Sequence, residues 1–119
     1  MRIALDNCVD RRLARLLRDH ETRHASELGW QTLQNGQLLA AAAAGGFHVF
    51  ITVDQNIRFQ QRLVDLPLPV LEINVRDTRF KAISALAPHL PGALALTARF
   101  HFVSLTADGM TETLAPRTG

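Results

Sequence analysis

The stretch FHVFITVDQN, residues 47–56, decides the fold class of this chain of 119 residues. Residues 47–53 are mostly branched or aromatic, which is typical of a strand buried within a sheet. The strand ends in Asp54, and residues 54–64 then predict a helix. A buried strand that leads directly into a helix is the first half of a βαβ unit, so this stretch favours a parallel sheet.

A second stretch, RIALDNC at residues 2–8, repeats the same arrangement. Residues 2–6 predict a strand that ends in Asp6, and an asparagine follows within two residues, as it does after Asp54. A helix is expected next, because apolar side chains recur at helical spacing at Val9, Leu13, Leu16 and Leu17. Strands that alternate with helices predict an α/β fold with a mostly parallel central sheet flanked by helices.

The rest of the chain continues this alternation. We expect an extended segment at 21–25, an irregular turn at 27–30, a helix at 35–46, a strand within 66–75, a helix at 77–90 that stops near Pro88 and Pro91, and a last strand at 99–105. No linker or repeat interrupts these elements. The pattern predicts a single domain over residues 1–107, followed by a flexible tail over residues 108–119.

Composition narrows the class of protein. With 47% hydrophobic and 20% charged residues, the chain has the make-up of a soluble globular domain. Its single cysteine excludes an internal disulfide and a zinc cluster built from several thiolates. No signal peptide or membrane span is visible, which predicts a cytoplasmic protein with no membrane partner. The net charge of +2 is weaker than the charge typical of a dedicated nucleic-acid-binding domain.

The two strand-end carboxylates, Asp6 and Asp54, are the leading candidates for a functional site. Open parallel sheets bind ligands beyond the carboxyl ends of their strands, where the strand order switches. We therefore expect the two side chains to share a site. A purely structural role is the alternative: Asp54 and Asp10 can each cap the helix that follows, and Asn35 can cap the helix at 35–46. Cys8 is expected to be a small buried residue.

Basic and aromatic residues near the candidate site allow two interpretations. Arg58, Arg62 and Arg11 can bind the phosphates of a substrate, or they can simply lie on solvated helix faces. Trp30 and Phe59 can stack on a nucleic-acid base, although an isolated aromatic residue more often belongs to the core. These residues alone do not decide between the two interpretations.

Three segments taken in order resemble one known family. LDNCVDRRLARLL (5–17), ELGWQTLQNGQLLAAAAAGGF (27–47) and VFITVDQNIRFQQ (49–61) are similar to the PIN-like DUF5615 family. The resemblance covers residues 1–75 well and the rest loosely. It implies a PIN-like domain over residues 1–107. PIN domains are Mg²⁺- or Mn²⁺-dependent nucleases, typically ribonucleases, and this family is often found among bacterial toxin–antitoxin genes.

Position by position, the resemblance assigns the metal site to Asp6 and Asp54. Many relatives carry further acids where this chain has Asn7, Asn35 and Asn56. Two carboxylates can hold one Mg²⁺ or Mn²⁺, and the amides can complete the oxygen shell without adding charge. Such a metal lowers the pKa of its bound water and offsets the charge that develops during phosphodiester hydrolysis. Asp10 and Asp77 are further acids that can be recruited to the site.

Three functions follow as hypotheses. The first is a metal-dependent endoribonuclease that cleaves RNA phosphodiesters, acting as the toxin of a toxin–antitoxin pair, with a cognate antitoxin protein as partner. The second is a catalytically weakened PIN-like module that binds RNA or a partner protein without cleavage, because amides have replaced acids. The third is a structural subunit of an oligomer, such as a homodimer, that associates through the apolar residues 86–103.

Overall fold

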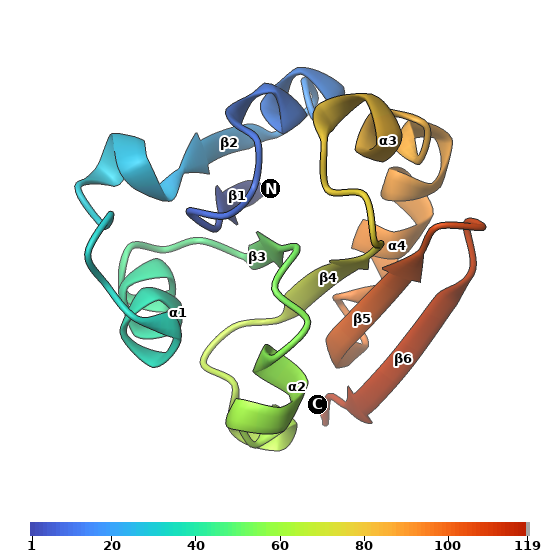
Figure 1. The fold of residues 1–119 in the computed structure, drawn as a ribbon. Coiled ribbons are helices and arrows are strands. Elements are labelled where there is room, and N and C mark those ends of the chain that lie inside the picture. Colours follow the sequence, from blue (N-terminus) through green and yellow to red (C-terminus); the bar gives the residue numbers. More distant parts are fainter. Residues whose placement is uncertain (119) are drawn as a thin grey trace.

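One six-stranded sheet organises the chain in a computed structural model that describes residues 1–118 (Figure 1). The strand order is β2-β1-β3-β4-β5-β6, and all strands are parallel except β6, which runs antiparallel to β5. The strands are β1 (Arg2–Leu5), β2 (Glu21–His24), β3 (Val49–Thr52), β4 (Val70–Asn74), β5 (Phe100–Thr106) and β6 (Thr111–Pro116). The expected α/β fold with a mostly parallel sheet is confirmed.

Helices cover both faces of this sheet. The α-helices are α1 (Asn35–Ala44), α2 (Ile57–Gln60), α3 (Phe80–Ser84) and α4 (Leu90–Leu96). The 3₁₀ helices are η1 (Arg11–Leu16), η2 (Ala25–Leu28), η3 (Leu63–Asp65) and η4 (Ala87–His89). None of the helices in residues 1–118 is long and apolar enough to cross a membrane.

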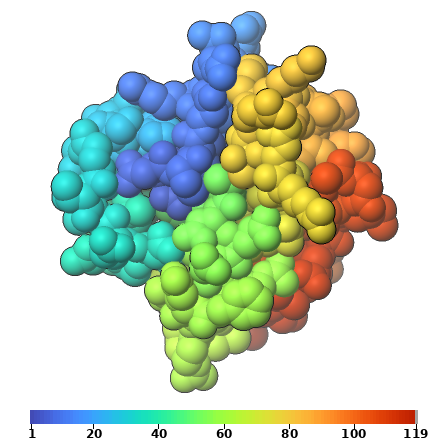
Figure 2. Space-filling view, viewed as in Figure 1, coloured from blue at the N-terminus to red at the C-terminus, as the bar shows by residue number. Residues whose placement is uncertain are grey.

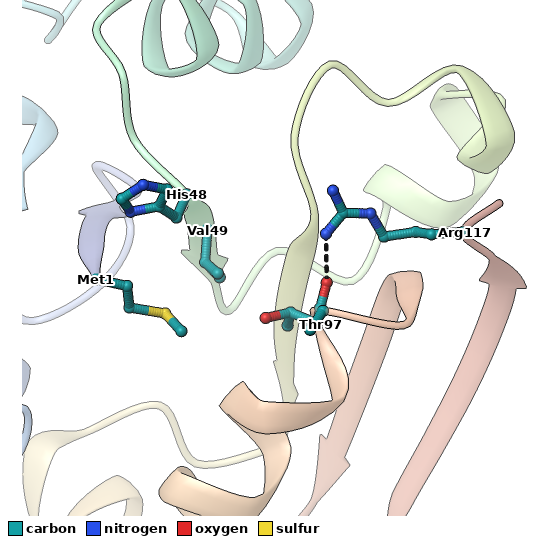
Figure 3. Close-up of a pocket in the computed structure, with 6 residues that line it drawn as sticks. Met1, His48, Val49, Thr97 and Arg117 are labelled. Atoms are coloured by element: carbon teal, nitrogen blue, oxygen red, sulfur yellow. Dashed lines mark hydrogen bonds between the residues drawn. The ribbon is translucent and has the colours of Figure 1, made fainter. Parts of the chain in front are cut away.

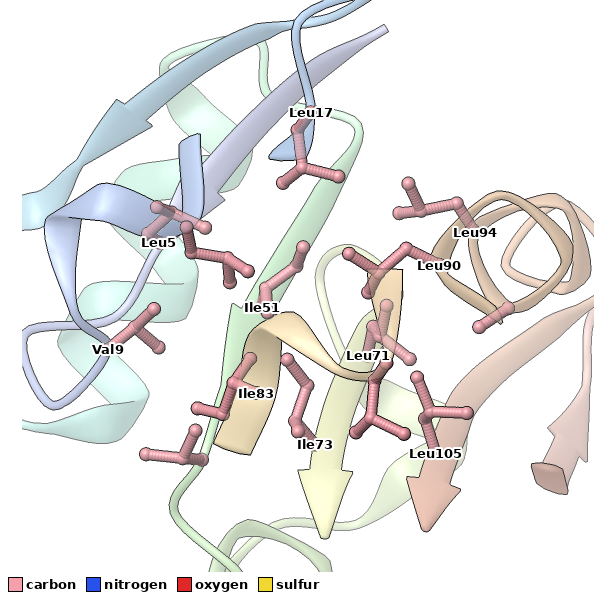
Figure 4. Packing of buried hydrophobic residues seen from close by; sticks show 14 of the residues in the cluster. Leu5, Val9, Leu17, Ile51, Leu71, Ile73, Ile83, Leu90, Leu94 and Leu105 are labelled. Carbon is pink, nitrogen blue, oxygen red and sulfur yellow. The ribbon is translucent and has the colours of Figure 1, made fainter. Parts of the chain in front are cut away.

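Alternating side chains of the central strand β3 divide the core into two clusters. Val49 and Ile51 pack on one face with side chains from η1, α3 and α4, and Figure 4 shows this cluster around Ile51 and Leu71. Phe50 packs on the other face with side chains from α1 and α2. Thr52 lies on the same face as Phe50, because successive side chains of a strand point to opposite faces. This second face carries the polar side chains described below.

Helix boundaries differ from the expected ones where proline or aspartate intervenes. The first helix is the 3₁₀ helix η1, and Asp10 caps it by accepting a hydrogen bond from the backbone N–H of Arg12 at 2.9 Å.

The single helix expected at 77–90 is instead divided into α3, η4 and α4. Pro88 and Pro91 each lie in the first turn of a helix, where the missing N–H has no intrahelical partner to lose. They therefore start helices here, and α4 extends past the predicted stop.

The flexible tail predicted at 108–119 is corrected by β6. Gly109 has a φ of 83° and allows the chain to reverse, and the backbone N–H of Thr106 then donates to the carbonyl of Met110 at 2.9 Å. In the resulting hairpin, Phe102 lies opposite Leu114. Without β6, the outer side of β5 would be an unpaired strand edge. Pairing with β6 supplies the hydrogen-bond partners on that side. Gly119, the last residue of the predicted tail, lies outside the described residues.

The apolar segment 86–103 does not present an exposed face for another subunit. Most of its large side chains are buried in the core of the chain itself, with exposed fractions of 3% for Leu86, 1% for Leu90 and 3% for Leu94. Phe102 is likewise fully buried. Leu96 and Phe100 are partly buried and pack against the same core cluster as the three leucines. This segment therefore packs the domain internally, and the oligomer hypothesis loses the surface on which it was based.

Candidate functional site

Asp6 and Asp54 lie at the point where the strand order reverses. Strand β1 is flanked by β2 on one side and by β3 on the other, so the chain leaves β1 in one direction and later returns on the opposite side. Asp6 directly follows β1, and its backbone N–H donates to the carbonyl of Ile51 in β3 at 2.9 Å. Asp54 follows β3 by two residues. The carboxyl ends of strands at such a switch point form the usual ligand crevice of an open α/β sheet.

The segments that follow β1, β3 and β4 meet on one face of the molecule. Figure 2 shows these segments side by side in blue, green and yellow. The side chain of Gln55, just after β3, donates to the carbonyl of Val75, just after β4, at 3.0 Å. The loop that carries Asp54 is thereby joined to the next loop along the sheet edge.

The carboxylate of Asp6 is buried, with a residue exposure of 4%, and neutral groups surround it. Its Oδ2 accepts a hydrogen bond from the Thr52 hydroxyl at 2.7 Å and another from the Cys8 thiol at 3.4 Å. Its Oδ1 accepts from the backbone N–H of Asn7 at 2.7 Å. A buried carboxylate is costly unless it is hydrogen-bonded or paired with a cation. Here the protein supplies hydrogen bonds, and no residue in the range 1–118 forms a salt bridge with this carboxylate.

Asp54 is held at the same edge by a different set of donors. Its Oδ1 accepts from the backbone N–H of Asn56, and its Oδ2 accepts from the amide of Asn35, both at 2.9 Å. The Asn35 amide also donates to Gln60 in α2 at 3.1 Å. Asn35 is therefore not the cap that was considered for α1: Gln34 precedes the helix as its N-cap. Asn35 instead joins α1 to the Asp54 loop.

Thr52 connects the carboxylate of Asp6 with the backbone of Asp54. Its hydroxyl donates to Asp6 and accepts from the backbone N–H of Asp54 at 2.9 Å. One buried side chain thus fixes the position of both candidate residues. Neither Asp6 nor Asp54 forms a salt bridge within residues 1–118. The result is a pair of hydrogen-bonded acids at the sheet edge that no cationic side chain of the described residues pairs with.

Asn7 and Asn56, the other two amides predicted to support the site, differ in how well they are placed to add an oxygen ligand. The Nδ2 of Asn7 donates to the carbonyl of Trp30 at 3.1 Å, which orients the amide and leaves its oxygen as a free acceptor in the described part of the chain. Asn56 is exposed and contacts Asp54 through its backbone N–H, while its side chain has no hydrogen bond among residues 1–118. Asn7 is therefore the better placed of the two to add an oxygen ligand beside Asp6.

A third carboxylate, missed in the sequence analysis, lies next to Thr52. Glu72 is the register partner of both Thr52 on β3 and Ser104 on β5, so it faces the same side of the sheet. It is fully buried; its Oε1 accepts from Ser104 at 2.7 Å, and its Oε2 has no hydrogen-bond partner. The available signal was a glutamate among the apolar residues of VLEIN, since a charged residue inside a buried strand is rare without a partner.

Arg58 is that partner. Its guanidinium donates to Glu72 and to Glu112 of β6, both at 2.9 Å, and it lies over the ring of Phe102 at 5.2 Å. Burial lowers the pKa of Arg58, but the hydrogen bonds and charge of Glu72, followed by those of Glu112, outweigh it, so the pKa is raised. Arg58, predicted to bind a substrate phosphate, is thus engaged in an internal ion pair that ties α2 to β4 and β6.

The remaining predicted basic residues lie on the surface. Arg62 is 82% exposed and contacts Asp65 at 3.5 Å, and Arg11 is 65% exposed and contacts Glu27 at 3.9 Å. Weak exposed ion pairs of this kind exchange readily for other partners. Both guanidinium groups are therefore free to meet a phosphate.

Asp10 and Asp77, considered as further metal ligands, are each paired with an arginine two residues later. Hydrogen bonds from Arg12 lower the pKa of Asp10 to about 2, and hydrogen bonds from Arg79 lower the pKa of Asp77 to about 2. An open pocket of about 470 Å³ is lined by Asp77, Arg79, Lys81 and Ala82, not by Asp6 or Asp54. The structure thus brings Asp6 and Asp54 together and leaves these two acids in local pairs.

The pKa of the Cys8 thiol depends in part on the charge of Asp6. The residue is exposed, contrary to the expectation of a small buried side chain. Its pKa is raised, first by the partial burial of the sulfur and then by the neighbouring Asp6 charge. We expect Asp6→Asn to lower the pKa of Cys8, so that iodoacetamide alkylates the thiol faster at neutral pH, as measured by mass spectrometry.

The matched control for this alkylation experiment is Asp10→Asn. Asp10 is also two residues from Cys8, but its carboxylate bonds to Arg12 instead. The rate for this variant should match that of the wild-type protein. Equal rates in Asp6→Asn and Asp10→Asn would contradict the assigned contact between the thiol and Asp6.

Phe59 and Trp30 occupy different environments. Trp30 is half-buried and packs edge-on against Phe47, with ring centroids 6.0 Å apart. Phe59 is 82% exposed on α2, next to Gln60, which binds the same Asn35 amide as Asp54. Trp30 therefore belongs to the packing of the domain, and Phe59 is the aromatic side chain available to a ligand near the site.

Comparisons with known proteins found no match to the chain among family models, curated proteins or solved structures. Within residues 1–118, no three His, Cys, Asp or Glu side chains gather in a group that could hold a metal ion. Mg²⁺ usually takes only one or two carboxylates and keeps several waters, so a magnesium site does not require a group of three such side chains.

Proposed function

We propose that the chain is a PIN-like domain protein that cleaves RNA phosphodiesters with one Mg²⁺ or Mn²⁺ held by Asp6 and Asp54. The observation that carries this proposal is the pair of aspartates at the switch point of the sheet, which form no salt bridge within residues 1–118. Thr52 bonds to the carboxylate of Asp6 and to the backbone N–H of Asp54. Uncompensated negative charge at a fixed position attracts a divalent cation. The similarity of residues 1–75 to the PIN-like family supports the choice of RNA as substrate.

Each residue of the site has a role in this proposal. Asp6 and Asp54 supply carboxylate oxygens, and Asn7 supplies a neutral amide oxygen. Thr52 keeps the carboxylates in position. The bound ion would generate a nucleophilic water and offset charge on the phosphate. Arg62 and Arg11 are the exposed guanidinium groups assigned to the RNA backbone, whereas the bonds of Arg58 to Glu72 and Glu112 give it a structural role.

The toxin role belongs to the same proposal. The family that the sequence resembles is often found among toxin–antitoxin genes, and a toxic ribonuclease requires a protein that blocks it. A cognate antitoxin is therefore the protein partner that we assign. The support for this step is the resemblance alone.

Titration with metal followed by an RNA cleavage assay tests the proposed activity. We expect Mn²⁺ to bind the purified protein with a measurable heat in calorimetry and to trigger cleavage of single-stranded RNA. Excess EDTA should abolish cleavage, and added Mn²⁺ should restore it. Absence of both heat and cleavage at millimolar metal would contradict the proposal. Cleavage that survives EDTA would point to a contaminating metal-independent ribonuclease.

Phe59 is expected to stack on an RNA base next to the cleaved phosphate. We expect Phe59→Ala to weaken the binding of single-stranded RNA, measured in EDTA by fluorescence anisotropy, by about five- to a hundredfold, because stacking contributes ~1–3 kcal/mol per base. Phe59→Trp should retain affinity. Val64→Ala, which truncates an apolar side chain that is 56% exposed, is the control. An equal loss in the Phe59→Ala and Val64→Ala variants would contradict a specific stacking role.

A second function, binding of RNA or a partner protein without cleavage, is favoured by one observation. An amide of Asn35 occupies Oδ2 of Asp54, at a position where many members of the resembled family carry an acid. This bond takes up an oxygen that a metal could use. RNA binding in EDTA together with no heat on addition of Mn²⁺ would support this function over cleavage.

A further inference from the structure

A pocket lies at the opposite edge of the sheet from Asp6 and Asp54. It measures about 260 Å³ and is lined by Met1, His48, Val49, Thr97, Ala98 and Arg117. These residues come from the beginning of β1 and β3, the end of α4 and the end of β6. Figure 3 shows His48 and Met1 on one side of the opening and Thr97 and Arg117 on the other.

The imidazole of His48 is oriented by the backbone of β1. Its Nδ1 accepts a hydrogen bond from the backbone N–H of Arg2 at 2.8 Å, and the backbone N–H of His48 donates to the carbonyl of Arg2 at 2.8 Å. Because Nδ1 acts as an acceptor, the proton of the neutral ring is on Nε2. This Nε2–H has no partner among residues 1–118, so it is a fixed donor at the pocket.

The guanidinium of Arg117 supplies donors from the other side. One Nη1–H donates to the carbonyl of Thr97 at 2.8 Å, and the backbone N–H of Arg117 donates to Arg99 at 2.8 Å. These two bonds fix the side chain and its backbone. Arg117 forms no salt bridge within the described chain. Most of its five N–H donors therefore remain available in the fork geometry that suits carboxylates and phosphates.

The lining of the pocket selects an anion of limited size. None of its six residues is acidic, and the hydroxyl of Thr97 already donates to the carbonyl of Leu94 at 2.6 Å. Met1, Val49 and Ala98 contribute apolar walls. The volume lies just below the ~300 Å³ at which pockets begin to enclose drug-sized molecules.

We propose that this pocket binds a small oxyanion, a carboxylate or phosphate group on a short apolar body, through His48 Nε2 and the Arg117 guanidinium. The proposal is independent of the activity assigned to Asp6 and Asp54. Arg117 also satisfies the carbonyl of Thr97, the C-cap residue that follows α4, which is its structural role. Anion binding would use the guanidinium N–H donors that do not bind the Thr97 carbonyl.

Nuclear magnetic resonance titration with two probes tests the pocket. Inorganic phosphate and butyrate are added separately to labelled protein, with chloride at equal ionic strength as the reference. We expect saturable shifts of the His48 ring and the Arg117 Nε–H signals in the millimolar range. A preference for butyrate would identify a carboxylate ligand, and a preference for phosphate would identify a phosphate ligand. No saturable shift with either probe would overturn the proposal.

Matched variants separate this site from general charge attraction. We expect Arg117→Gln to weaken binding of the preferred probe by at least about tenfold, since a hydrogen bond to a charged group is worth ~1.5–3 kcal/mol. Arg99→Gln removes the same charge from the same sheet edge, but Arg99 does not line the pocket, so its affinity should stay unchanged. Equal losses in both variants would refute the site. Arg117→Lys keeps the positive charge but lacks the forked guanidinium. An affinity between those of the wild-type protein and the Arg117→Gln variant would confirm that the fork geometry contributes to binding.

Discussion

Arg58→Met is expected to lower the free energy of unfolding by about 3–5 kcal/mol, because it leaves the buried carboxylate of Glu72 without a countercharge. Glu72 is fully buried, and its remaining hydrogen-bond partner is Ser104. Arg58 is only 20% exposed, so water does not readily replace it. Urea unfolding followed by circular dichroism measures the loss.

A double variant makes this prediction specific. Arg58→Met combined with Glu72→Leu removes both charges, and buried ion pairs replaced by apolar residues are often neutral or even stabilising. We therefore expect the double variant to recover most of the lost stability. Arg62→Met, in the same segment but 82% exposed, should cost less than about 1 kcal/mol. If Arg58→Met costs no more than Arg62→Met, the pair with Glu72 is not the anchor of α2.

Asp6→Asn and Asp54→Asn are each expected to reduce the proposed metal-dependent RNA cleavage by at least about a hundredfold. A catalytic metal contributes several kcal/mol of charge stabilisation to the transition state, and ~2.7 kcal/mol already corresponds to a hundredfold in rate. Both substitutions keep the size of the side chain and remove its charge. Initial rates on a labelled single-stranded RNA at fixed Mn²⁺ provide the measurement.

Controls distinguish loss of metal from loss of structure. Asp65→Asn removes a carboxylate that is 65% exposed and contacts only Arg62 among the described residues, so its rate should equal that of the wild-type protein. Calorimetry should show weaker Mn²⁺ binding for the Asp6 and Asp54 variants, and circular dichroism should show folded protein. Folded variants that cleave RNA at the wild-type rate would exclude these acids as metal ligands.

Amide groups around Asp54 bear on the choice between the proposed cleavage function and its alternative, binding without cleavage. Asn35 donates to Asp54 and Gln60, so it stabilises the loop even without metal. Glu72 adds negative charge beneath the site, but Arg58 balances it. This part of the sheet offers a cation two carboxylates, those of Asp6 and Asp54, which form no salt bridge within residues 1–118.

Local patterns predicted the framework of the site well. Strand β3 was evident from its branched residues, and α1 from an alanine-rich run that ends at Gly45. The same patterns misjudged η1 and the segment around Pro88, because helix type and proline position depend on hydrogen bonds rather than on apolar spacing. The strand β6 was missed because TETLAP carries little apolar signal and becomes a strand by pairing with β5.

The sequence by itself determined the α/β class and the position of Asp6 and Asp54 at the ends of two buried strands, because strand periodicity is a property of neighbouring residues. Only the tertiary structure decided which groups meet across the sheet. The Thr52 hydroxyl reaches Asp6 from 46 positions away, and Arg58 reaches Glu72 from 14 positions away. Such contacts follow from the strand order and the pairing register, which no local pattern in the chain encodes.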